Sequence, residues 1–129
     1  MSALLDSALL GQLNAEPSDH QPVWFMRQAG RSLPEYRKLR ESFGMLEACL
    51  TPDVAAEITL QPVRRHGVDA AVFFSDIVIP LKLAGIDVDI APGVGPVLDA
   101  PIRRPSDLER LRPLTADALA PIREAVGVT

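Results

Sequence analysis

Two groups of residues in this sequence have types and positions suited to chemistry. Arg27 and Arg31 flank the short segment RQAGR, which directly follows the apolar run VWFM at 23–26. Asp76 follows a second apolar run, DAAVFF at 69–74, in the same way. Ligands of parallel α/β folds bind at the carboxyl ends of the strands. We therefore expect these side chains at the ligand-binding face of the fold.

The arginine pair is typical of an anion-binding site. Two neighbouring guanidinium groups repel each other unless an anion lies between them, and each offers planar donors that match a carboxylate. On spacing alone, an equally good interpretation is two solvated arginines, or arginines paired with Glu35 and Glu41. Asp76 is also open to two interpretations, an acid that faces a ligand or the N-cap of the next helix. An ionised carboxylate only accepts hydrogen bonds, so its ligand should carry N–H or O–H donors or a developing positive charge.

The other candidate residues indicate structure rather than chemistry. The GVGP segment at 93–96 predicts a turn, because no helix start follows it and Pro96 removes a backbone donor. Cys49 is interpreted as a small apolar core residue. His20 lies in a polar loop and His66 lies near a helix end, and neither is expected to act as a base.

Composition excludes several classes of protein. The chain has 129 residues, 47% of them hydrophobic and 23% charged, which is typical of a globular domain and not of a disordered chain. Its net charge of −4 argues against nucleic acid or an anionic membrane as the main partner. One cysteine and two histidines exclude a disulfide framework and a multi-cysteine zinc site. The N-terminus lacks signal-peptide features and no segment is long and apolar enough to span a membrane, so we expect a cytosolic protein.

Apolar periodicity and turn residues predict an alternation of helices and strands. The expected helices are 2–13, 35–43, 52–66, 77–84, 106–111 and 115–126, and the expected strands are 23–26, 69–74 and 86–90, with a short one near 97–98. Thr51 is the predicted capping hydroxyl of the 52–66 helix, and Gly67 is its predicted end.

This alternation predicts an α/β protein with a parallel sheet. Only two or three core strands are present, whereas a complete (β/α)₈ barrel has eight strands and about 250 residues. We therefore interpret residues 1–129 as a single partial domain, the front end of a larger one.

Two segments give the sequence a family resemblance. PVWFMRQAGRSLPEYRKLRE at 22–41 closely resembles the N-terminal signature of the uroporphyrinogen decarboxylase family, and FFSDIVIPLKLAGIDVDIAPGVGP at 73–96 resembles that family's second block. The first segment is long and unusual, which makes the resemblance specific. Ser32 departs from the pattern, because the family often carries an aromatic residue there.

The resemblance implies a (β/α)₈ TIM barrel, of which this chain would supply the N-terminal helix and the first βα units. It implies a cytosolic homodimer in haem and porphyrin biosynthesis that uses neither a metal nor an organic cofactor. The implied reaction removes carbon dioxide from the four acetate side chains of uroporphyrinogen III to give coproporphyrinogen III. A polycarboxylate substrate of this kind explains why an acidic protein would carry an arginine pair.

The resemblance also implies roles for individual residues. Substrate binding is implied for Arg27, Gln28, Ala29, Gly30, Arg31, Arg40 and Asp76. Asp76 and Arg27 are the implied catalytic residues. Asp76 would accept from the pyrrole N–H groups and stabilise a cationic intermediate. A guanidinium is a poor general acid, so binding and orientation are the expected role of Arg27.

The family's further substrate contacts, a tyrosine, a hydroxyl residue and a histidine, are expected beyond Thr129. The chain resembles roughly the first third of the enzyme, so we expect the 129 residues alone not to decarboxylate. Two alternatives come from other classes of protein. One is a related barrel methyltransferase, and the other is a non-catalytic anion-binding remnant.

Overall fold

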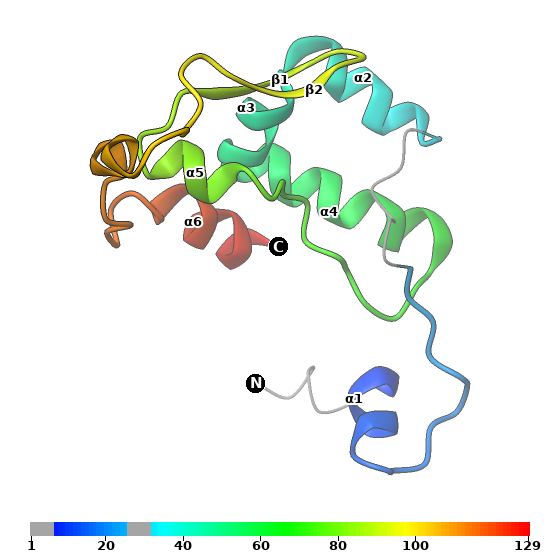
Figure 1. The fold of residues 1–129 in the computed structure, drawn as a ribbon. Coiled ribbons are helices and arrows are strands. Elements are labelled where there is room, and N and C mark those ends of the chain that lie inside the picture. The colour runs from blue at the N-terminus through cyan, green and yellow to red at the C-terminus, as the bar shows by residue number, and fades with distance from the viewer. Residues whose placement is uncertain (1–6, 26–31) are drawn as a thin grey trace.

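The computed structural model describes residues 7–25 and 32–129. Within these residues, the elements in chain order are helices, one β-hairpin and a short 3₁₀ helix (Figure 1). They are α1 (Ala8–Leu13), α2 (Pro34–Ser42), α3 (Met45–Leu50), α4 (Pro52–His66), α5 (Ile79–Leu83), β1 (Val88–Ala91), β2 (Gly95–Leu98), η1 (Pro105–Arg110) and α6 (Ala120–Val128).

Helix α4 is the element around which the others pack. It contacts α2, α3 and α6, and its Ala55 and Ile58 are completely buried. Pro52 lies in its first turn, where the missing N–H is not needed, and the helix ends at Gly67 with a left-handed φ of 62°. The predicted bounds of this helix are confirmed.

The predicted capping role of Thr51 is wrong. Its side chain makes no cap hydrogen bond to α4, and its hydroxyl instead donates to the carbonyl of Glu47 at 2.9 Å. Thr51 is at once the C-cap residue of α3 and the N-cap residue of α4, because α4 begins directly after α3 ends. The Glu47 carbonyl therefore accepts two hydrogen bonds, one from the N–H and one from the hydroxyl of Thr51.

The hairpin lies across the side of the molecule that carries α3 and α5 (Figure 1). Strand β1 pairs antiparallel with β2, with Val88 opposite Leu98 and Ala91 opposite Gly95. The turn between them uses positive φ values at Gly93 (74°) and Gly95 (102°), which only glycine adopts easily. The predicted strand at 86–90 is confirmed with a start two residues later, and so is the predicted turn.

The two predicted parallel strands are not β-strands in the part of the chain that the structure describes. Residues 23–25 and 69–74 belong to no β-sheet there, and Met26 lies outside the described residues. A backbone hydrogen bond joins the start of the two segments, from the N–H of Asp69 to the carbonyl of Val23 at 2.8 Å. A strand requires a continuing ladder of such bonds, so its formation depends on both segments together.

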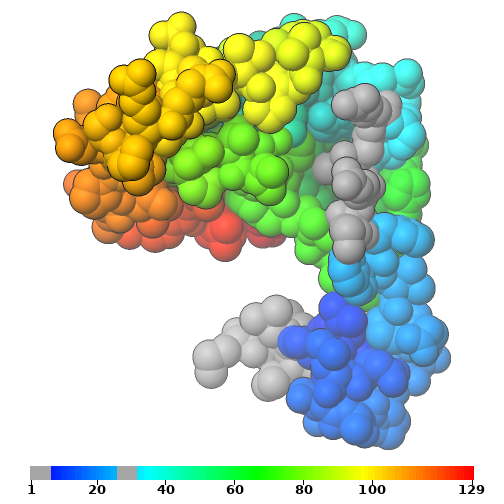
Figure 2. Space-filling view, viewed as in Figure 1, coloured from blue at the N-terminus to red at the C-terminus, as the bar shows by residue number. Residues whose placement is uncertain are grey.

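The N-terminal segment extends away from the helical body. Figure 1 shows α1 below the other helices, and Figure 2 shows the blue residues as a separate lobe joined to the body at one side. The described part of the predicted 2–13 helix is α1, whose first turn is capped by the Ser7 hydroxyl. Residues 14–22 are irregular, as predicted.

Both predicted C-terminal helices differ from their expected form. Residues 105–110 form the 3₁₀ helix η1, which buries no side chain, so tertiary packing does not favour a longer α-helix there. The Thr115 hydroxyl accepts from the N–H of Ala118, as a cap should, but it closes only a turn. Helix α6 then begins at Ala120, with Pro121 in its first turn.

Candidate functional site

The segment that leads to Asp76 is anchored in the core by a buried threonine. The N–H of Phe74 donates to the Thr59 hydroxyl at 2.9 Å, and that hydroxyl donates to the carbonyl of Ala55 at 2.7 Å. The ring of Phe74 also meets Tyr36 edge to face, with centroids 6.1 Å apart. Helices α4 and α2 therefore both hold the residue two positions before Asp76.

Asp76 lies at the turn that opens α5, partly exposed. Its Oδ1 accepts from the N–H of Val78 at 2.9 Å, and its carbonyl accepts from the N–H of Ile79 at 3.1 Å. The sequence left open whether this carboxylate caps a helix or faces a ligand. The structure shows a contact within the turn before α5 rather than a helix cap, because the N-cap residue is Val78 and no side chain caps this helix. The turn contact occupies one of the two carboxylate oxygens.

Arg40 lies on α2, and its orientation is set by its own helix end. Its Nη1 donates to the carbonyl of Phe43 at 2.5 Å, the residue that follows the helix. Such a bond satisfies one of the open carbonyls at a helix C-terminus. Only some of the five guanidinium N–H groups are used in this way, and the rest remain suited to a planar anion.

A groove of about 690 Å³ separates α2 from the tip of the hairpin. Its walls combine an aromatic ring, apolar side chains, two guanidinium groups and one carboxylate. The lining residues of the α2 side are Tyr36, Arg37, Arg40, Glu41 and Met45, and those of the hairpin side are residues 90–95. Such a lining suits a ligand that is apolar over its face and anionic at its edge.

Cys49 shows that Arg40 and Asp76 lie near the same part of the core. The thiol is completely buried, and its pKa is raised to about 12. Burial is the largest cause, the negative charge of Asp76 also raises this pKa, and the positive charge of Arg40 lowers it. Both charges therefore reach one buried sulfur, which stays protonated and serves as a core residue as expected. Within the described residues, no ion pair joins Arg40 to Asp76.

The remaining predicted site residues lie outside the described residues. These are Arg27, Gln28, Ala29, Gly30 and Arg31. One alternative partner for the arginine pair is accounted for, since Glu35 pairs with Arg65 at 3.2 Å.

Sequence reasoning missed two residues of the groove, Tyr36 and Arg37. They occur on α2 together with Arg40 and Glu41, a spacing that places all four on one face of a helix. That spacing is the signal in the sequence, but it does not distinguish a groove wall from the solvated face of an exposed helix.

The described residues contain neither a candidate metal site nor a candidate membrane-spanning helix. No group of three or more histidine, cysteine, aspartate or glutamate side chains is arranged to hold a metal ion there. In the same residues, no helix has the length and apolar character needed to cross a bilayer.

Comparison with known proteins places the chain in a family. A family model described as uroporphyrinogen decarboxylase (URO-D) matches residues 5–129. The chain belongs to the uroporphyrinogen decarboxylase family. It is 64% identical over 127 residues to the uroporphyrinogen decarboxylase of Streptomyces coelicolor and 64% identical over 124 residues to that of an Arthrobacter species. These alignments cover 98% and 96% of this chain but 36% of each relative, so the chain spans about a third of their length.

A solved structure supports the fold. The chain is similar to a methyltransferase from Methanosarcina mazei with a TM-score of 0.63 and 23% sequence identity, over 96% of this chain and 37% of that one. At this identity the likeness concerns the fold alone. Together with membership of the uroporphyrinogen decarboxylase family, it supports an α/β fold, of which the described residues contain the helices and one hairpin.

Proposed function

We propose that this chain is the N-terminal part of a carboxy-lyase that acts on uroporphyrinogen III. The observation that carries the proposal is its 64% identity, over 98% of its length, to a protein named uroporphyrinogen decarboxylase. The groove beside Arg40 supports the proposal, because a cationic and apolar lining matches a macrocycle with a carboxylate edge.

In the proposed site, arginines bind the carboxylates of the substrate. Arg27, Arg31 and Arg40 form charge-assisted hydrogen bonds to acetate or propionate groups. Asp76 accepts from pyrrole N–H groups with the carboxylate oxygen that does not accept from the N–H of Val78. The chain between the first two arginines completes the binding segment, with residues Gln28, Ala29 and Gly30.

The proposed reaction uses the substrate's own pyrrole ring to hold electrons. A proton adds to a ring carbon and makes the ring an iminium-like cation. The bond between the acetate methylene and its carboxylate then breaks, its electron pair enters the cationic ring, and carbon dioxide leaves. A proton adds to the exocyclic methylene to form the methyl group, and the first proton leaves the ring carbon, so each step consumes one proton. The fixed negative charge of Asp76 stabilises both cationic stages.

The finer architecture belongs to the same proposal. We infer a (β/α)₈ barrel in the complete enzyme, a cytosolic homodimer, and a reaction without metal or organic cofactor. The chemistry supports the last point, because the protonated pyrrole supplies the electron sink that a cofactor would otherwise supply.

A chimera tests the function directly. This chain replaces the aligned 36% of the Streptomyces coelicolor relative, and product formation from uroporphyrinogen III is compared with that of the 129-residue chain alone. We expect turnover in the chimera and none in the isolated chain, whose predicted further contacts lie beyond residue 129.

Matched variants of the chimera identify the residues that carry the activity. Arg27→Ala should abolish most turnover, whereas Arg103→Ala, an exposed arginine remote in sequence from the proposed site, should not. A folded chimera without turnover would contradict the proposed function. The methyltransferase alternative is not favoured, because the methyltransferase likeness reaches only 23% identity.

A further inference from the structure

One cluster of polar side chains outside the proposed site holds the two functional segments together. The Oδ2 of Asp69 accepts from the N–H of Val23 at 2.7 Å, and the N–H of Asp69 donates to the carbonyl of Val23 at 2.8 Å. Both backbone polar groups of one residue are therefore bound to another residue 46 positions away. We call this arrangement, together with His20, the Asp69 clamp.

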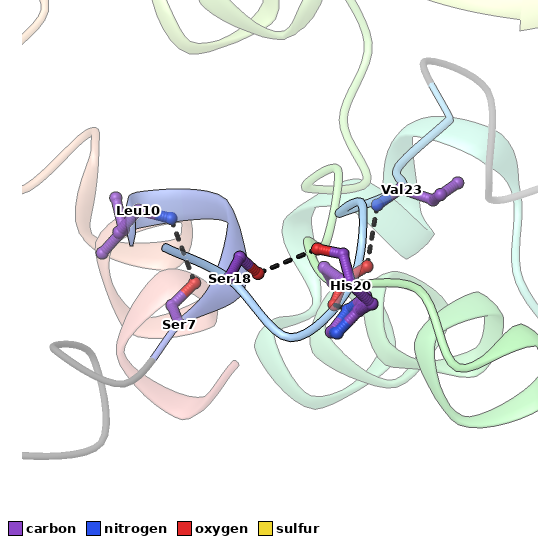
Figure 3. Close-up of polar contacts among 6 residues, drawn as sticks. Ser7, Leu10, Ser18, His20 and Val23 are labelled. Carbon is purple, nitrogen blue, oxygen red and sulfur yellow. Dashed lines mark hydrogen bonds and ion pairs between the residues drawn. The ribbon is translucent and has the colours of Figure 1, made fainter. Parts of the chain in front are cut away.

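His20 fixes the orientation of the clamping carboxylate. Its Nε2 lies 2.7 Å from the Oδ1 of Asp69, and the Ser18 hydroxyl donates to the His20 carbonyl at 2.8 Å. Figure 3 shows Ser18, His20 and Val23 gathered around this point. Each oxygen of Asp69 thus has one partner, and the side chain is only 18% exposed although His20 is 56% exposed.

The clamp joins an exposed segment to one that is anchored in the core. Val23, Trp24 and Phe25 are all more than 40% exposed, so apolar packing contributes little to holding that segment. The other segment is anchored because Phe74 is buried and bonded to Thr59. The hydrogen bonds of Asp69 to Val23 attach the exposed segment to the anchored one at this point.

We propose that Asp69 is a positioning residue, which sets the place from which the chain runs on to the Arg27–Arg31 motif. Arg27 follows Val23 by four residues and Asp76 follows Asp69 by seven. An extended chain advances about 3.3 Å per residue, so the clamp lies within roughly 25 Å of both ends along the chain. Its consequence for catalysis rests on the proposed function, but its effect on the backbone does not.

Amide exchange of valine N–H groups in the complete gene product tests the clamp without an activity assay. Selective ¹⁵N-valine labelling reports on Val23, whose N–H is bound by Asp69, and on Val78, whose N–H is bound by Asp76. In Asp69→Ala we expect Val23 to exchange at least about tenfold faster, while Val78 is unchanged. Asp99→Ala, an exposed aspartate beyond β2, is the matched control and should change neither.

The conservative variant supplies a second readout. In Asp69→Asn the amide oxygen can still accept from the N–H of Val23, and the amide N–H₂ faces the ring nitrogen of His20. Protection of Val23 should therefore largely survive in Asp69→Asn, whereas it is lost in Asp69→Ala.

The outcomes separate the clamp from the proposed activity. Unchanged Val23 exchange in Asp69→Ala overturns the proposal, and so does equal acceleration at Val23 and Val78, which would mean general loss of stability. If the chimera turns over uroporphyrinogen III, Asp69→Ala in the chimera should lose about tenfold in kcat/KM and Asp69→Asn should recover most of it. A folded chimera without turnover contradicts the proposed function, and the exchange result alone then decides on the clamp.

Discussion

At the scale of single residues, Asp76 combines a structural contact with a proposed chemical one. Its Oδ1 accepts from Val78, and its charge reaches the thiol of Cys49 near Arg40. The turn contact needs only an acceptor, whereas stabilising a cationic ring needs a negative charge. Substitution can separate the two roles, because asparagine keeps the acceptor and removes the charge.

We predict that Asp76→Asn in the complete gene product lowers the decarboxylation rate by about 10²–10³ without loss of stability. Asp76→Ala should show the same loss of rate and also lose about 1 kcal/mol of unfolding free energy, because the hydrogen bond to the N–H of Val78 is gone. Turnover of uroporphyrinogen III and urea unfolding measure the two effects. Wild-type turnover in Asp76→Asn would leave Asp76 with the turn contact only.

Arg37 is a further residue to test, because it lines the groove. Its backbone N–H makes an ordinary helix bond to the carbonyl of Leu33. If the groove holds a carboxylate edge of the substrate, Arg37→Ala should raise KM about tenfold and leave kcat nearly unchanged. Lys38→Ala removes a charge from the next position on the same helix, outside the groove lining, and should alter neither constant. Equal effects of the two variants would mean that only the overall electrostatic potential of the protein, and not a contact in the groove, affects substrate binding.

At the scale of elements, α4 supports the site through a single hydroxyl. Thr59 is 1% exposed and bridges the carbonyl of Ala55 and the N–H of Phe74. The backbone before Asp76 has no strand ladder to hold it within the described residues, so this bridge takes part of that role. Removing the hydroxyl would leave a buried N–H without an acceptor.

We predict that Thr59→Val lowers the unfolding free energy by about 1–3 kcal/mol, although valine has nearly the same shape. Thr59→Ser keeps the hydroxyl and loses one methyl group, so it should cost about 1 kcal/mol. Urea unfolding compares the two variants. If Thr59→Val proved as stable as the wild type, the hydroxyl bridge would contribute nothing to the anchoring of Phe74.

At the scale of the whole molecule, three carboxylates of the described residues have lowered pKa values, which make the free energy of unfolding depend on pH. Hydrogen bonds from the N–H of Val23 and from His20 lower the pKa of Asp69, and those from the N–H groups of Arg103 and Arg104 lower the pKa of Asp107. The pKa of Glu35 is lowered by a backbone hydrogen bond and by Arg65. Each group is more readily ionised in the folded chain than in the unfolded one.

A lowered folded pKa means that the stabilising contribution is complete above the ordinary carboxyl values of 3.8 for aspartate and 4.5 for glutamate. It is lost as pH falls through the lowered folded values. We therefore predict that the unfolding free energy declines below about pH 4, as measured by urea unfolding between pH 7 and pH 2. Asp107→Asn should make this decline shallower. A stability that rises in acid would contradict the assignment.

Much of the fold and part of the site were predictable from local sequence. Helices α2 and α4 and the hairpin follow from proline, glycine and apolar spacing, which act over a few residues. The strands predicted at 23–26 and 69–74 are not formed in the described residues, because strand formation depends on a partner elsewhere in the chain. Asp76 was a candidate from its place after an apolar run and Arg40 from the family resemblance, whereas the face of α2 that carries Tyr36 and Arg37 was not predicted.

The amino-acid sequence by itself determined the family and the local elements, since 64% identity and short-range backbone preferences need no coordinates. Only the tertiary structure decided which polar groups meet. The carboxylate of Asp69 is hydrogen-bonded to Val23 and His20. The hydroxyl of Thr51 donates to α3 and does not cap α4. The charges of Arg40 and Asp76 both affect the pKa of one buried thiol. Such contacts join residues brought together by chain packing, and no local pattern records them.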